Sequence, residues 1–128
     1  MEFISAEEFL KQPKEVQEVF LEWANDNAED YDLVQDNGEI MLYKDFIERA
    51  RIEFDSYPLF TEGQIRRFIE DKTKYHLDTM YYVESYDIRI TEGLNNIKVY
   101  ENLGTKLLQA YWKVACEIAK ESDDLSIK

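Results

Sequence analysis

The N-terminal part of the chain begins with apolar residues at helical spacing. Ser5 and Glu8 have the spacing of a capping box, which predicts a helix that begins near residue 6. Pro13 interrupts or restarts this helix, because proline is tolerated only in the first turn. The apolar positions that follow at helical spacing are Val16, Val19, Phe20 and Trp23. Residues 25–27, Asn-Asp-Asn, are expected to end the helix.

A hairpin is predicted next, because Asn37-Gly38 supplies the two positive-φ positions of a type I′ turn between residues 31–35 and 39–43. Helical spacing then returns over residues 43–54, although residues 51–54 also alternate as a strand would. Tyr57-Pro58 stops that element. Thr61 and Gln64 form a second capping box, which predicts a helix that runs to about residue 72.

The C-terminal half predicts a second hairpin and a long helix. Residues 76–84 and 86–91 alternate and are rich in β-branched and aromatic side chains, so we expect two strands that turn at Glu84-Ser85. Residues 92–96 are expected to form a loop. One apolar stripe then predicts a helix ending near Glu121, and the pattern extends back to Ile97 through Tyr100. The stripe consists of Leu107, Leu108, Tyr111, Val114, Ala115, Ile118 and Ala119.

This order of elements favours an α+β fold over a doubly wound parallel sheet. The expected architecture is two β-hairpins forming a small antiparallel sheet, with about four helices packed against it. We expect a single globular domain over residues 1–121 and a frayed tail over residues 122–128.

The charge of the chain limits the classes of partner that it can bind. Its 128 residues include 28 acidic and 15 basic residues, a net charge of −13. Such a chain is a poor ligand for nucleic acid or anionic membranes, whose phosphates require cations, and it favours a basic partner. The single cysteine, Cys116, suits a reducing cytoplasm, and we expect neither a signal peptide nor a membrane span.

An uninterrupted acidic run is the most unusual feature. From Glu15 to Tyr43 there is no lysine or arginine. If the first helix and first hairpin lie side by side, the carboxylates of this run share one surface that would attract a basic cleft and present charge in place of phosphates. The alternative is a solvated face that only provides solubility. The predicted partner-binding residues are Glu15, Glu18, Glu22, Asp26, Glu29, Asp30, Asp32, Asp36 and Glu39.

No pattern in the sequence indicates a catalytic, cofactor or metal site. Asp30, Asp32 and Asp36 fail the spacing of a calcium-binding EF-hand loop, whether the loop starts at Asp30 or at Asp32. The one histidine, His76, has Asp78 two residues away but no nucleophile placed by a motif. Cys116 is expected to be a buried structural residue. The four glycines match neither a P-loop nor a dinucleotide-binding pattern.

Two further features leave alternatives open. Helices on either side of Tyr57-Pro58 allow a helix-turn-helix interpretation with residues 62–72 as the reader, although the acidic field opposes DNA. The only basic concentration lies there, at Arg49, Arg51, Arg66, Arg67, Lys72 and Lys74. The adjacent aromatic pairs Tyr81-Tyr82 and Tyr111-Trp112 either expose one member each, as at an interface, or lie in a core thick enough to cover both.

Three segments together resemble small proteins carried by phages and prophages of Gram-positive bacteria. They are ISAEEFLKQPKEVQEVFLEW (residues 4–23), LFTEGQIRRFIEDK (59–72) and LLQAYWKVACEIAKE (107–121). That family has no assigned chemistry, so no functional residue can be carried over. The resemblance implies a phage accessory protein that acts in a bacterial cytoplasm, where many such proteins counter host defence.

The sequence therefore predicts a non-enzymatic inhibitor of a nucleic-acid-handling host defence protein, of the anti-CRISPR or anti-restriction type. It would bind a basic surface of that protein through an acidic, phosphate-mimicking surface, without cofactor, metal, membrane or direct nucleic-acid contact. The alternative is a protein-binding or homo-oligomeric phage protein whose charge serves solubility only.

Overall fold

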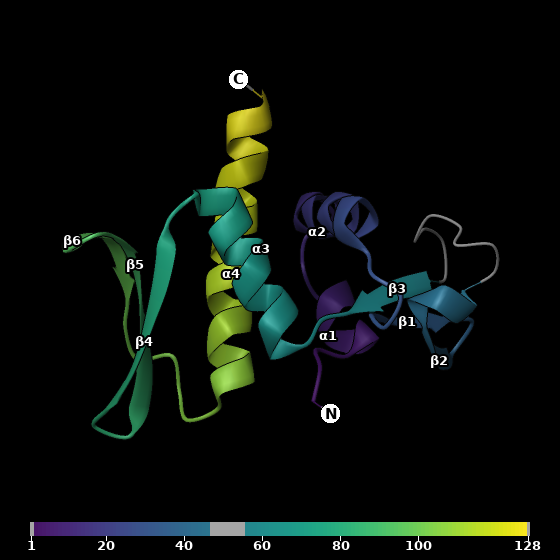
Figure 1. Ribbon diagram of the computed structural model, residues 1–128, viewed down its shortest axis with the longest axis horizontal. Helices are drawn as coiled ribbons and strands as arrows, with labels where there is room; N and C mark the ends of the chain where they lie inside the picture. Colours follow the sequence, from purple (N-terminus) through teal and green to yellow (C-terminus); the bar gives the residue numbers. More distant parts are fainter. Residues whose placement is uncertain (1, 47–55, 128) are drawn as a thin grey trace. The chain divides into compact units, whose positions relative to one another are not determined.

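The computed structural model describes residues 2–46 and 56–127. The chain divides into two units, which we call the N-terminal unit (Phe3–Phe60) and the C-terminal unit (the first two residues with Thr61–Lys128). Each unit combines helices with one three-stranded antiparallel sheet (Figure 1). The predicted α+β class is confirmed, with two small sheets in place of one. The predicted domain boundary at residue 121 stays a prediction.

The sheet of the N-terminal unit has one strand of the predicted hairpin at its centre. Its elements are α1 (Ala6–Leu10), α2 (Lys14–Asn27), β1 (Leu33–Asp36), β2 (Glu39–Leu42), a 3₁₀ turn η1 (Tyr43–Asp45) and β3 (Ser56–Leu59). The strand order is β2-β1-β3, and both pairings are antiparallel. The predicted hairpin therefore gains a third strand from the segment that contains Pro58.

Local sequence explains where these elements begin and end. The Ser5 hydroxyl accepts a hydrogen bond from the Glu8 backbone N–H at 3.2 Å, which caps α1. Pro13 immediately precedes α2 and separates it from α1, as predicted. Asn37 and Gly38 have φ of 50° and 85°, so the type I′ turn is confirmed. Of the helix predicted over residues 43–54, residues 43–45 form η1, and residues 47–54 lie outside the described part of the chain.

Aromatic packing fixes which face of α2 points inward. The rings of Phe20 and Phe60 lie 5.4 Å apart between centroids, and Trp23 and Phe60 lie 6.3 Å apart. Phe9 of α1 completes this cluster at 6.3 Å from Phe20. Val16, Phe20, Trp23 and Ala24 are all buried on one side of α2, so the opposite side faces outward.

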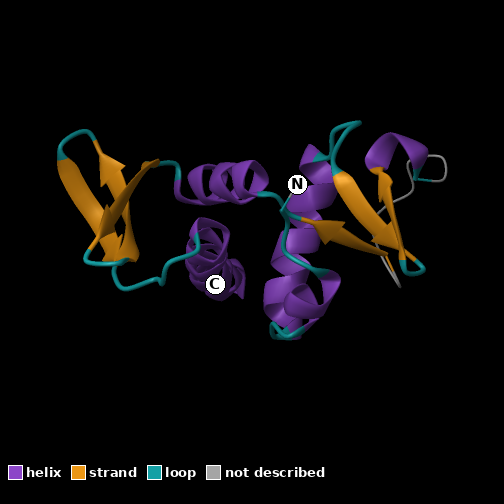
Figure 2. Ribbon diagram, turned by 90° about the horizontal axis from the view of Figure 1, so that it is seen from below, coloured by secondary structure: helices purple, strands orange, loops and turns teal. Residues whose placement is uncertain are grey.

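The C-terminal unit packs a three-stranded meander against two helices (Figure 2). Its elements are α3 (Glu62–Thr73), β4 (His76–Tyr82), β5 (Ser85–Glu92), β6 (Asn95–Tyr100) and α4 (Leu107–Ile127). The Thr61–Gln64 capping box at the start of α3 is confirmed. Ile88 and Ile90 of the central strand are buried, and the Thr79 hydroxyl lies 2.7 Å from the Tyr111 hydroxyl, which ties β4 to α4.

Four predictions for this unit were wrong. The hairpin turns at Val83-Glu84, one residue before the predicted position, because Tyr82 pairs with Ser85. Residues 92–96 are not a loop, because Gly93 and Leu94 form a two-residue turn, with Gly93 at φ 61°, and the other three residues belong to β5 and β6. Residues 97–100 belong to β6 rather than to a helix. The last helix also continues to Ile127, six residues beyond the predicted end at Glu121.

Candidate functional site

Four of the nine predicted partner-binding residues form one stripe along α2. At 3.6 residues per turn, these four positions span an arc of about 80° and a length of about 16 Å. All four side chains are exposed, and they lie on the side of the helix away from its aromatic contacts. We call this surface the acidic stripe, and it consists of Glu15, Glu18, Glu22 and Asp26.

The acidic stripe lies in the more acidic of the two units. None of its four carboxylates forms an ion pair with another residue in the described part of the chain. By sequence, residues 3–60 contain 15 acidic and five basic residues, a formal charge of −10, whereas the remaining 70 residues contain 13 and ten, a formal charge of −3. The negative charge of the protein is thus concentrated in the N-terminal unit.

The other five predicted residues continue from α2 into the hairpin. Glu29 and Asp30 are exposed in the connecting segment, and Glu39 is exposed at the start of β2. Asp32 is half-buried, and its carboxylate accepts a hydrogen bond from the Glu29 backbone N–H at 2.8 Å, so this residue shapes the loop. Asp36 pairs directly with Glu39 across the hairpin, which places two like charges side by side.

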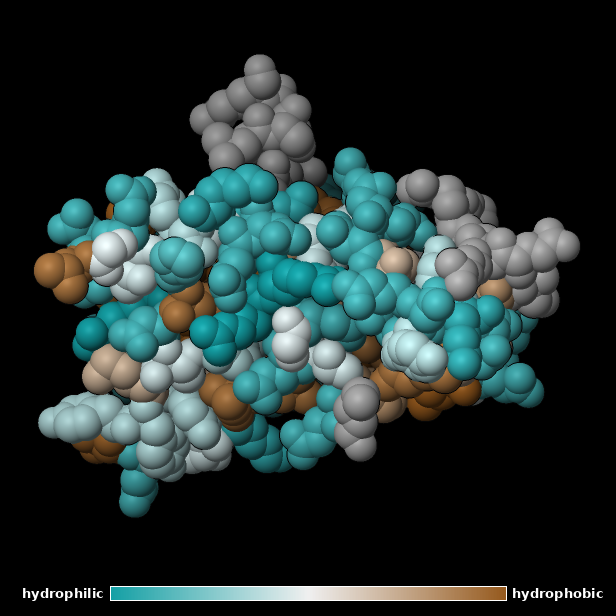
Figure 3. Space-filling model, viewed as in Figure 1, coloured by the Kyte–Doolittle hydropathy of each residue, from teal (hydrophilic) through white to brown (hydrophobic). Residues whose placement is uncertain are grey.

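The sequence thus identified an outward-facing acidic face on α2, and the structure places its members together. The other five carboxylates lie in the connection between α2 and β1 and at the β1–β2 hairpin, and they differ in exposure and in hydrogen bonding. That all nine form one continuous surface stays a prediction. The hydrophilic character of the protein is visible in Figure 3, where hydrophilic side chains dominate the face shown.

The structure also places the other residues that the sequence suggested as candidates. His76 is exposed at the start of β4, and Cys116 is buried in α4 as predicted. In the predicted reader helix, Arg66 forms an exposed ion pair with Glu70 at 3.2 Å. Arg49 and Arg51 lie outside the described residues. The aromatic pairs follow neither alternative uniformly. Tyr81 and Tyr82 are both exposed, whereas Tyr111 and Trp112 are both buried.

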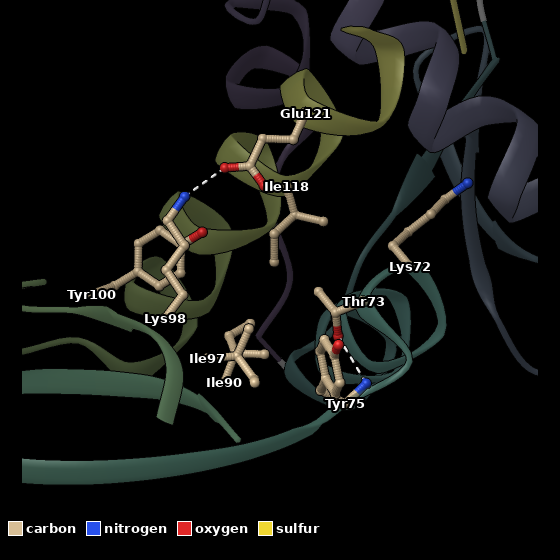
Figure 4. Close-up of a pocket in the computed structure, with 9 residues that line it drawn as sticks. All are labelled: Lys72, Thr73, Tyr75, Ile90, Ile97, Lys98, Tyr100, Ile118 and Glu121. Carbon is tan, nitrogen blue, oxygen red and sulfur yellow. Dashed lines mark hydrogen bonds and ion pairs between the residues drawn. The ribbon is translucent and has the colours of Figure 1, made fainter. Parts of the chain in front are cut away.

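Sequence reasoning missed a pocket in the C-terminal unit. This pocket has a volume of about 250 Å³ and lies where the end of α3, the β5–β6 pair and α4 meet (Figure 4). Its size is slightly below the range of about 300–1,000 Å³ that is usual for ligand sites. It could not be found from the sequence, because the apolar side chains that line it come from four separate segments, which are the α3–β4 connection, β5, β6 and α4. They are Tyr75, Ile90, Ile97, Tyr100 and Ile118.

An ion pair lies at the edge of this pocket. The Lys98 ammonium donates to the Glu121 carboxylate at 2.5 Å, and this bond raises the pKa of Lys98. Burial raises the pKa of the neighbouring Tyr100 hydroxyl, and a hydrogen bond with Lys98 partly opposes that effect. Both charged side chains are about half exposed, so the pair stabilises the unit by little, about 1 kcal/mol at most.

Comparison with known proteins adds no family to these observations, since no family model, curated protein or solved structure matches the chain. Among the described residues, no group of three histidine, cysteine, aspartate or glutamate side chains is placed to hold a metal ion. No described helix has both the length and the apolar character needed to cross a bilayer. The acidic stripe is a candidate site because it gathers four exposed carboxylates on one side of α2.

Proposed function

We propose that this protein binds the basic, nucleic-acid-binding surface of another protein and blocks it. The observation that supports the proposal is the outward stripe of four carboxylates on α2, within a unit of formal charge −10. The protein acts by occupancy, without catalysis. In its most specific form, the proposal is a phage-encoded inhibitor that acts in a bacterial cytoplasm against a host defence protein such as a CRISPR effector or a restriction enzyme.

The charge density of the stripe supports mimicry of a phosphate backbone. Four charges over about 16 Å of helix give one charge per about 5.5 Å. One strand of B-DNA carries one charge per about 3.4 Å of axis. The stripe alone therefore has more than half the linear charge density of a single strand. A basic groove that releases counterions when it binds DNA would release part of the same population when it binds this helix.

Long-range attraction follows from the same charges. Summed over a surface, carboxylates of one sign produce potentials of several kT, which raise the association rate with a basic partner. The attraction weakens as salt shortens the Debye length, from about 30 Å at 10 mM to about 3 Å at 1 M. An interface formed by apolar contacts would lack this dependence, so salt distinguishes the proposal from a role in which charge provides solubility only.

A charge-reversal experiment tests the proposal. The tagged protein is used to capture partners from a bacterial host lysate, and the captured protein, once identified by mass spectrometry and purified, is titrated with wild type and variants in competition with its nucleic acid. The stripe variant carries Glu18→Lys, Glu22→Lys and Asp26→Lys. The matched control carries the same charge change on exposed residues of the C-terminal unit, Glu92→Lys and Glu101→Lys, together with Glu2→Lys.

We expect wild type and control to compete with nucleic acid, with an affinity that falls steeply with salt. The stripe variant should lose competition while its circular dichroism spectrum is unchanged. If the stripe variant binds as well as the control, the acidic stripe has no role in recognition. If the captured protein does not bind nucleic acid, inhibition by phosphate mimicry is wrong.

A further inference from the structure

Three two-residue turns connect the described hairpin strands, and two of them use the residues that such turns favour. Asn37-Gly38 forms a type I′ turn. Gly93 has φ 61° at the first central position of the turn that follows β5, as type II′ requires. The third turn is different, since Val83 and Glu84 occupy the two central positions with φ of 50° and 59°.

A valine in the left-handed region is strained. The left-handed conformation costs a residue with a Cβ atom free energy, and β-branched side chains are rare there. Packing does not explain the choice, because the Val83 side chain is 76% exposed. The same chain uses Asn-Gly for the same turn geometry elsewhere. Strained backbone positions cluster at functional sites such as ligand clamps and switch regions, so this turn is a candidate for contact with a partner.

Exposed aromatic side chains flank this turn. Tyr81 is 56% exposed and Tyr82 is 69% exposed. The Tyr81 ring lies 4.8 Å from the Tyr86 ring between centroids, so the two rings support each other. The closed end of the β4–β5 hairpin lies away from α3 and α4 in both ribbon views (Figures 1 and 2). Side chains of intermediate hydropathy gather over it at the lower left of Figure 3.

The charge around this turn indicates the chemistry of the partner. Residues 79–88 contain no lysine or arginine, but they contain Glu84 and Asp87, whereas Asp78 lies directly opposite Arg89 in the β4–β5 pair. The Lys113 ammonium donates to the Leu103 carbonyl beside Tyr86, so the acidic side of the tip is the one that carries Glu84. Tyrosine faces attract cations, and a guanidinium both stacks on an aromatic ring and pairs with a carboxylate. Nucleic acid and a second copy of this acidic chain would each be repelled. We name Tyr81, Tyr82, Val83, Glu84 and Tyr86 the hairpin tip.

We propose that the hairpin tip is a docking site for an arginine-bearing segment of a partner protein. The guanidinium stacks on an exposed tyrosine, the Glu84 carboxylate accepts its hydrogen bonds, and Val83 adds apolar contact. This inference deepens the proposed function, because it gives the proposed partner a second contact, on the C-terminal unit. The identity of the natural partner rests on the proposed function. The contact itself is independent of the acidic stripe.

Titration of the full-length protein tests the site by nuclear magnetic resonance. The probe is a blocked glycine-spaced peptide with two arginines, and the control peptide has lysines in their place. We expect amide shifts at residues 81–86 and weaker binding of the lysine peptide. Tyr82→Ala should weaken binding of the arginine peptide about two- to five-fold, the range expected for one exposed cation–π contact.

The outcomes separate this inference from the proposed function. Shifts confined to the acidic stripe would overturn the hairpin tip and leave the proposed function standing. Amide shifts at residues 81–86 that persist in the stripe variant support the hairpin tip, whether or not the stripe variant still competes with nucleic acid. Absence of shifts at residues 81–86, or equal binding of the two peptides, overturns the inference.

A turn replacement tests the strain on which the inference depends. Val83→Asn combined with Glu84→Gly installs the residues of the first hairpin turn. We expect Tm to rise by several degrees, and binding of the arginine peptide to weaken, since the Glu84 carboxylate and the Val83 side chain are gone. An unchanged or lower Tm would show that the turn is unstrained, and undiminished peptide binding would show that these two residues are not used.

Discussion

The two ends of α2 allow the energetic effect of the acidic stripe to be measured. Glu15 lies in the first turn of the helix, where a carboxylate stabilises the positive end of the dipole. Asp26 lies in the last turn, which contains no basic residue, so its charge opposes the negative end. Removal of one negative charge should therefore have different effects at the two positions.

The expected magnitudes follow from helix electrostatics. Asp26→Asn removes an unfavourable dipole interaction of about 0.3–1 kcal/mol. It also removes one like-charge contact with Glu22, at i and i+4, of about 0.2–0.5 kcal/mol. The free energy of unfolding should rise by about 0.5–1.5 kcal/mol. Glu15→Gln loses a favourable dipole interaction and gains relief from Glu18, so these terms roughly cancel. Helix propensity changes little in either substitution.

Urea unfolding of the full-length protein measures this difference. A Trp112→Phe background leaves Trp23, which is buried in the N-terminal unit, as the only tryptophan reporter. The advantage of Asp26→Asn should be clear at about 20 mM salt and should largely disappear at about 1 M, where the Debye length is about 3 Å. If Asp26→Asn is not more stable than Glu15→Gln at low salt, or keeps its advantage at high salt, the electrostatic argument for α2 is wrong.

Three further predictions concern the C-terminal unit. Thr61→Ala should lower its free energy of unfolding by about 1 kcal/mol, because the capping box is lost, and an unchanged urea midpoint would contradict this. Tyr111→Phe should cost about 1 kcal/mol because the Thr79 hydroxyl loses its partner, and adding Thr79→Val should recover part of that cost in a double-mutant cycle. Burial raises the Tyr100 pKa, so the stability that this phenol contributes is complete below pH 10.0 and is lost as pH rises through the raised value. Ultraviolet titration of wild type against Tyr100→Phe should show a phenol that ionises above pH 10.0, and a lower midpoint would refute the assignment.

Features encoded by a few neighbouring residues were predictable from the sequence. The Thr61–Gln64 capping box, the Asn37-Gly38 turn and the break at Pro13 each depend on local backbone chemistry, and the structure confirms all three. The outward acidic face of α2 was predictable for the same reason. It needs only the helical period and an apolar face on the opposite side.

Features that depend on distant pairing were not predictable. Ile97 and Tyr100 are three residues apart, so they fit the helical stripe that precedes Leu107 as well as they fit a strand. What decides in favour of β6 is the pairing of these residues with β5, together with the turn at Gly93. The pocket beside Lys98 was missed as a consequence, because it exists only once β6 lies against α4. Exposure of both Tyr81 and Tyr82 likewise follows from their place at a hairpin end.

The uneven distribution of charge is the feature that a binding role and a solubility role for the acidic residues explain differently. A charge of −13 would keep the protein soluble wherever it lay, and self-repulsion would be least if it were spread evenly. Instead the N-terminal unit carries −10, with like charges at successive turns of α2 and directly opposite each other at Asp36 and Glu39. Each such contact destabilises the folded unit by a few tenths of a kcal/mol, roughly 0.2–0.5 for the helical pairs. A basic partner that neutralised these charges would convert the same repulsion into binding free energy, because its cations would replace like-charge contacts with attractive ones. Charge neutralisation at Glu22 and Asp26 should therefore strengthen the fold and weaken binding together, whereas a solubility role predicts no effect on binding.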